Sequence, residues 1–118
     1  MEINKAIMTF SQSEKIKAGL IWVTHTLDIL QSLPDGEKKG GQKIIQAMLN
    51  MIGHETNLAR SVGENGGWAE TEACIDRALI MINSGISEEA TAHLGMALSK
   101  TTNFGQRSMS FLKEKGLL

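Results

Sequence analysis

The stretch IKAGLIWVTHTLDIL, residues 16–30, carries the pattern that decides the predicted fold. Its apolar residues recur at alternating spacings of four and three, giving a seam made of Ile16, Leu20, Val23, Leu27 and Leu30. This spacing places the five side chains on one face of an α-helix. Ser11 and Glu14 before it have the spacing of a capping box, and PDG at 34–36 has turn chemistry. We therefore expect a helix that starts near Ser11 and ends before the turn.

Three further segments repeat the pattern. The second seam contains a carboxylate, and its members are Ile44, Met48, Met51, Glu55, Leu58 and Val62, with Ile45, Leu49, Ile52 and Ala59 beside them. The third seam is Trp68, Ile75, Leu79 and Ile82. The fourth is Ala90, Leu94, Ala97, Thr101, Phe104, Ser108 and Phe111. Each spacing favours a helix, and no stretch alternates convincingly as a strand does.

Turn and capping residues separate these segments. The residues EKKGGQK, 37–43, are expected to form a loop that leads into the second helix, and ENGG, 64–67, ends that helix. Ser84 and Gly85 end the third helix. Ser87 is the expected N-cap of the fourth helix, and Gly116 is expected just after its last turn.

Four helices joined by short loops place sequence neighbours in opposite directions. The sequence therefore predicts an all-α fold, an antiparallel up-down-up-down four-helix bundle over residues 11–118. Ile3, Ile7 and Phe10 share one helical face, so residues 1–10 are expected to form a short leading helix or N-terminal arm.

Composition narrows the classes of function. The chain has 118 residues, the length of one domain, with 42% hydrophobic residues and a formal net charge of −1. That charge provides no broad basic surface for nucleic acid or an anionic membrane. No run approaches the roughly 18 apolar residues of a membrane span, and the N-terminus lacks the apolar core of a signal peptide. A single cysteine, Cys74, cannot form an internal disulfide, so we expect a cytoplasmic protein.

The first helix is apolar on two sides. Opposite its seam lie four residues at spacings of four, three and four, namely Ala18, Trp22, His25 and Ile29. A helix with two apolar faces is usually covered by its own bundle and by a second body. We expect that body to be a second copy of the chain, in a homodimer anchored by Trp22. The alternative is that the arm over residues 1–10 folds back onto Trp22.

Glu55 lies on a seam that should be buried, and a buried carboxylate must be paired, hydrogen-bonded or neutralised. Thr101, Ser108 and Arg60 are the expected partners for a structural role. The alternative is a metal or small-ligand site in the bundle core around Glu55, with His54 or His93 beside it. A dinuclear centre is not expected, because the chain has no Glu-x-x-His motif, and no cofactor is expected.

His54, in the middle of the second predicted helix, suggests another function. In its four helices and length the chain resembles the histidine-phosphotransfer domains, and the resemblance implies His54 as phosphoacceptor. That family carries Lys and Gly at the third and fourth positions after its histidine, whereas this sequence has Asn57 and Leu58. Gly53 precedes the histidine instead, and Arg60 is a nearby source of positive charge.

The function that these observations favour is non-enzymatic. We expect a small protein-interaction module that self-associates and binds another protein, because no catalytic signature accompanies the double-faced first helix. Phosphotransfer through His54 and a ligand site at Glu55 remain the alternatives.

Glycines inside the predicted helices indicate close helix approach or a groove, and they are Gly19, Gly53, Gly95 and Gly105.

Overall fold

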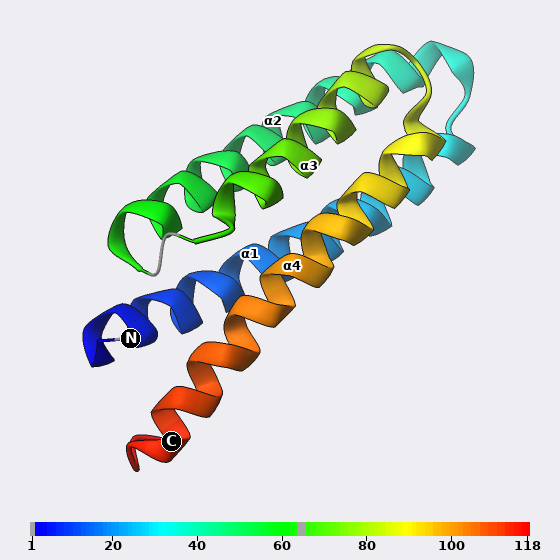
Figure 1. The fold of residues 1–118 in the computed structure, drawn as a ribbon. Coiled ribbons are helices and arrows are strands. Elements are labelled where there is room, and N and C mark those ends of the chain that lie inside the picture. Colours follow the sequence, from blue (N-terminus) through cyan, green and yellow to red (C-terminus); the bar gives the residue numbers. More distant parts are fainter. Residues whose placement is uncertain (1, 64–65) are drawn as a thin grey trace.

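The computed structural model describes residues 2–63 and 66–118, which form four α-helices without a strand (Figure 1). Helix α1 spans Ile3–Ser32, α2 spans Asp35–Val62, α3 spans Trp68–Asn83 and α4 spans Ser87–Glu114. The predicted all-α class with four helices is confirmed. With 16 residues, α3 is the shortest helix, as the short third seam predicts.

The four helices pack around one core, one at each corner of a square in cross-section. The bundle is elongated, 54 × 21 × 18 Å in extent. Helix α1 packs against α2 and α4, and α3 packs against the same two helices, whereas in the described residues the backbones of α1 and α3, and those of α2 and α4, do not approach each other closely. Residue numbers rise along one helix and fall along its neighbour in the contacting pairs Gly19–Ile52, Leu30–Gly41, Arg60–Glu72 and Gln46–Asn83. Figure 1 shows both chain ends at the same end of the molecule.

Helix α1 begins earlier than predicted. Residues 3–10, expected as a separate arm or short helix, are its first turns, and no helix start occurs at Ser11. Ala6 and Thr9 are buried, and a Cβ placed on Gly63 would overlap Thr9. The hydroxyl of Ser13 donates to the carbonyl oxygen of Thr9 at 2.6 Å, within the helix. Packing against the end of α2 thus extends the helix through the expected cap.

Helix α2 also begins earlier than predicted, because residues 37–43 are helical rather than a loop. Pro34 precedes the first turn, in which Asp35 and Glu37 place negative charge at the positive end of the helix dipole. Gly41 lies against α1, where an added Cβ would come within 2.9 Å of Leu30 Cδ1. The glycine therefore permits a close approach of α1 and α2 at this point. This packing accounts for a start of α2 at Asp35, before the predicted loop.

The buried core contains most of the predicted seams. All five seam residues of α1 are buried, and so are Trp68, Ile75 and Ile82 of α3 and the α4 seam from Ala90 to Ser108. Trp68 packs on Phe104 with ring centroids 4.4 Å apart, which joins the start of α3 to α4. Toward the end of α4, Leu112 is buried in place of the predicted Phe111, which is half-buried.

The predicted seam of α2 is wrong by one residue. The side chains that face the core are Ile45, Leu49, Ile52, Thr56 and Ala59. Ile44, Met51 and Leu58 are exposed, and Glu55 is half-buried at the edge. Thr56 is the cheaper polar residue to bury, because its hydroxyl donates to the carbonyl oxygen of Gly53 at 2.7 Å.

The C-terminal ends of α3 and α4 follow the predicted chemistry. Gly85 and Gly116 adopt φ values of 79° and 72° just after α3 and α4, the left-handed conformation that glycine tolerates. Ser87 is not an N-cap, since it is the buried first residue of α4 and Ile86 occupies the cap position. Glu64 and Asn65 of the predicted ENGG stop lie outside the described residues, and Gly67, with φ of 89°, caps α3.

Two leucine truncations test which face of α2 packs in the core, the observed face with Leu49 or the predicted face with Leu58. Leu49→Ala removes a fully buried side chain and should lower the free energy of unfolding by about 2–5 kcal/mol. Leu58→Ala, the same chemical change at an exposed position, should alter it by no more than about 0.5 kcal/mol. Urea denaturation of both variants measures the difference. An equal decrease in the free energy of unfolding for both variants, or a larger decrease for Leu58→Ala, would contradict the assignment of Leu49 to the core.

Candidate interaction surface

Large apolar side chains are exposed along the outer side of the contact between α1 and α2. Trp22 and Ile29 of α1 are 65% and 60% exposed, and Ile44 and Met51 of α2 are 65% and 61% exposed. Leu58 continues the row on α2 at 46%. The residues on each helix are seven apart, so they share one side of that helix. We call these five residues the α1–α2 face.

A groove of about 300 Å³ lies within this face, between the two helices. Gly19 and Trp22 form its α1 side, Met48 and Met51 its α2 side, and the other lining residues are Ile16, Ile52, Lys15 and Glu55. A Cβ on Gly19 would come within 3.1 Å of Ile52, so this glycine allows the close helix approach that the sequence indicates. The lining is mainly apolar.

The carboxylate of Glu55 bounds the groove with two partners from α1. Gln12 Nε2 donates to one carboxylate oxygen at 2.9 Å, and Lys15 Nζ donates to the other at 2.9 Å. The hydrogen bond from Gln12, and then that from Lys15, lowers the pKa of Glu55 below its ordinary value. Thr101, Ser108 and Arg60 are not its partners, because Glu55 lies on the α1 side of α2 rather than in the core.

The residues predicted for the interface lie where the sequence places them, outside the core. Trp22, His25 and Ile29 are exposed, and Ala18 is half-buried. Residues 3–10 continue the axis of α1 and leave Trp22 uncovered. The sequence analysis did not place Ile44, Met51 and Leu58 on this surface. The sequence contained one indication of this placement. A charged residue, Glu55, on the predicted seam argues that the adjacent row of α2 faces the core instead.

His54 is exposed and lines a cleft of about 250 Å³ between α2 and α3. The charged residues that line this cleft are Glu72 and Asp76, both acidic. Arg60, the expected source of positive charge, is ion-paired with Glu72. The described residues that line this cleft therefore include no free cation of the kind that would steady a phosphoryl group.

His93 is not close to the other two predicted ligands. It lies half-buried on α4, whereas His54 and Glu55 lie on α2, and the described backbones of these two helices do not approach each other closely. Residues 2–63 and 66–118 contain no group of three or more His, Cys, Asp or Glu side chains arranged to hold a metal ion. The three residues thus occupy three separate environments.

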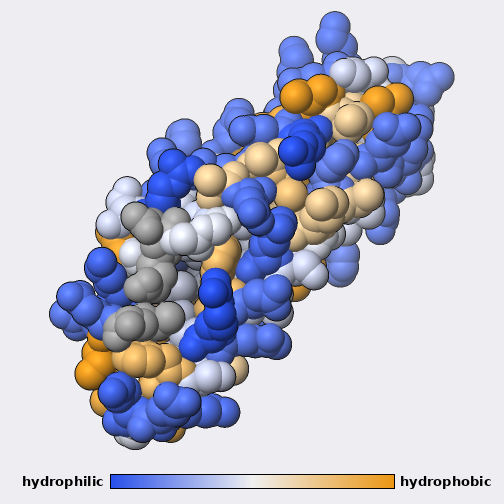
Figure 2. Space-filling model, viewed as in Figure 1, coloured by the Kyte–Doolittle hydropathy of each residue, from blue (hydrophilic) through white to orange (hydrophobic). Residues whose placement is uncertain are grey.

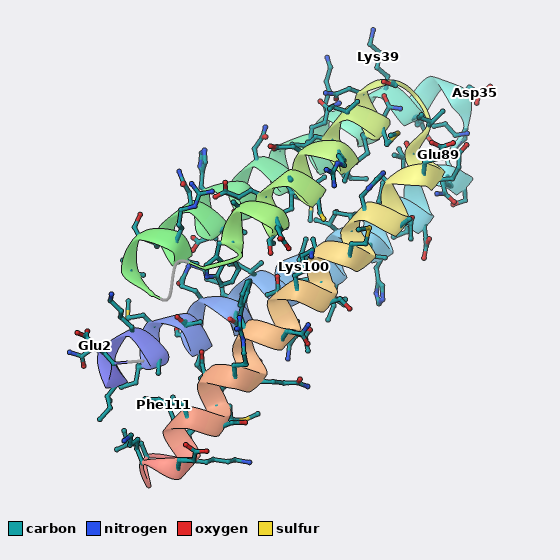
Figure 3. The ribbon with its side chains drawn as sticks, in the orientation of Figure 1. Glu2, Asp35, Lys39, Glu89, Lys100 and Phe111 are labelled. Carbon is teal, nitrogen blue, oxygen red and sulfur yellow. The ribbon has the colours of Figure 1, made fainter. Side chains whose placement is uncertain are left out.

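The α3–α4 side of the molecule has a different character. Figure 2 shows hydrophilic residues over most of this face, with hydrophobic residues in separate small areas. Lys100 of α4 reaches Glu70 of α3 at 2.8 Å, and the Arg107 guanidinium lies 5.1 Å from the centre of the Phe104 ring (Figure 3 labels Lys100). The Lys100–Glu70 ion pair thus joins α3 to α4 at the exposed surface of this side.

No helix in the described part of the chain is long and apolar enough to cross a membrane. Comparisons with protein-family models, with curated proteins and with solved structures find no match to the chain. The interpretation of the surface therefore rests on its own geometry.

Replacing Glu55 tests the polar cluster. Glu55→Gln should lower the free energy of unfolding at neutral pH by less than about 1 kcal/mol, because solvent screens this half-exposed ion pair. Since folding lowers the pKa of Glu55, its stabilisation is present at neutral pH and is lost as the pH falls below about 5. Urea denaturation at pH 7 and at acidic pH should show the two proteins converging. Glu2→Gln, at an exposed carboxylate, is the control (Figure 3), and a difference that grows on acidification would contradict the assignment.

Chemical phosphorylation tests the histidine. Incubation with acetyl phosphate should leave His54 unlabelled, because the cleft offers carboxylates rather than free cations. Mass spectrometry of peptides under conditions that preserve phosphohistidine provides the measurement. A phosphorylated peptide that carries His54, and that disappears in His54→Gln, would restore the phosphotransfer hypothesis.

Proposed function

We propose that this protein is a non-enzymatic interaction module that forms a homodimer through the α1–α2 face. We propose further that the bundle is antiparallel, with up-down-up-down topology. In support, Gly19 lies near Ile52 and Leu30 lies near Gly41, so residue numbers rise along α1 as they fall along α2. The observation that carries the proposal is the exposure of Trp22 and Ile29 on α1 and of Ile44 and Met51 on α2, the two helices that border an apolar groove.

The area of the face supports the proposal of a dimer. Its five side chains together expose roughly 500 Å² of apolar surface, near the upper end of what monomeric proteins leave uncovered. Two copies would bury about 1,000 Å² from these residues alone, and that is about the least a specific interface needs. Burial of so much apolar surface supplies the driving force for association.

The charge of the face favours a second copy over a partner of opposite charge. Lys15 and Glu55 are the charged residues that line the groove, and they neutralise each other. Two identical faces can therefore meet without like-charge repulsion from the groove. Trp22 is the expected anchor, because aromatic side chains dominate the binding energy of many interfaces.

Removing the anchor tests the proposal. Trp22→Ala should raise the dissociation constant of the dimer by at least about thirtyfold, the loss of a binding hot spot of 2 kcal/mol or more. Native mass spectrometry and light scattering over a range of protein concentrations measure it. Fluorescence adds a second readout, because Trp68 is fully buried and only Trp22 should change its emission on association.

Ile80→Ala is the matched control for this experiment. Ile80 is a large apolar residue of α3, 59% exposed and outside the α1–α2 face, so its truncation should leave the dimer intact. A wild-type chain that stays monomeric at every concentration would end the proposal. So would a dimer that tolerates Trp22→Ala but dissociates with Ile80→Ala.

A further inference from the structure

Resting on the proposed dimer, we infer how the two copies fit together: Trp22 of each copy inserts into the groove of the other and packs against its Met51. The two contacts are related by a two-fold axis that passes close to Trp22. The groove is then incomplete in one copy, and its occupant is the side chain that a second copy supplies.

The first argument is the shape of the face. It carries a projecting indole, 65% exposed at Trp22, and next to it an apolar groove of about 300 Å³. This volume is at the small end of the range for ligand pockets, a size that one aromatic side chain can fill. A projection and a matching groove on one surface make that surface complementary to a second copy of itself.

The second argument is closure. In a two-fold interface, if residue i contacts residue j of the partner, then residue j contacts residue i. Trp22 itself lines the groove, so a two-fold axis beside it brings each indole next to the groove of the other copy. Both projections and both grooves are then used, and no unfilled groove remains to propagate a filament.

The third argument is the chemistry of the groove wall. Met51 is 61% exposed, and Met48, half-buried, lies on the same wall. Methionine side chains adapt to irregular shapes and make favourable sulfur contacts with aromatic rings. At one end, Lys15 and Glu55 form a polar rim that would shield the inserted indole from solvent.

Mixing two variants tests this arrangement. A Trp22→Ala homodimer and a Met51→Ala homodimer each lose both copies of the Trp22–Met51 contact. A heterodimer of the two variants retains one of the two Trp22–Met51 contacts intact. Both truncations fall in the other contact. If the residues touch across the interface, the heterodimer should bind at least about fivefold more tightly than the geometric mean of the two homodimers, after correction for statistics.

The control mixture combines Trp22→Ala with Ile80→Ala. Each mixture sets one Trp22 against one truncated position 22, so any coupling between the two tryptophans is the same in both. Native mass spectrometry resolves the three dimers by mass. Both Trp22 and Met51 are exposed in the monomer, so their truncation leaves the core intact. Trp22→Leu replaces Trp22→Ala if that homodimer is too weak to quantify.

The outcomes separate the inference from the proposed function. Enhanced heterodimer formation relative to the control supports insertion of Trp22 beside Met51. Weakened homodimers without enhancement would overturn the insertion and leave the dimer face in place. A monomeric wild-type chain would overturn both.

Discussion

The rotation of α2 about its own axis is the constraint on which the surface of this protein depends. The core accepts Leu49, Ile52 and Thr56 from α2, and the adjacent row of residues then turns toward the outer side of α1. Glu55 comes to the edge of the helix contact, where Gln12 and Lys15 reach it. Desolvating a threonine whose hydroxyl is bonded within its helix costs far less than burying a carboxylate. One polar position therefore decides which apolar row is exposed.

The cluster of Gln12, Lys15 and Glu55 has two consequences from a single geometry. It satisfies both oxygens of a carboxylate that would otherwise oppose the packing of α1 on α2. It also cancels the charge at one end of an apolar groove, so the face beside it carries little electrostatic signature. The contribution to stability is small because the pair is partly solvated.

The sequence predicts some elements well because only one arrangement satisfies them. In α1 the row from Ile16 to Leu30 is apolar throughout, whereas the opposite row with Trp22 and Ile29 includes His25. That difference assigns the first row to the core without tertiary information. In α2, two adjacent rows are both apolar, and a helical period of 3.6 cannot choose between Met51 and Ile52. The early starts of α1 and α2 were missed for another reason. They depend on contacts between distant segments, such as Gly63 with Thr9 and Gly41 with Leu30, which local capping rules do not include.

The closed ring of helices has a consequence for how the chain folds. Three of its four helix contacts join neighbours in sequence, and each can form from a short hairpin. The contact of α1 with α4 joins the two ends of the chain and is the one pairing in the described structure with a long loop-closure entropy. The hairpins should form early and the α1–α4 contact late. Until it forms, Leu20 and Val23 of α1 are covered on one side only, so this contact sets the time for which the apolar interior stays open to solvent.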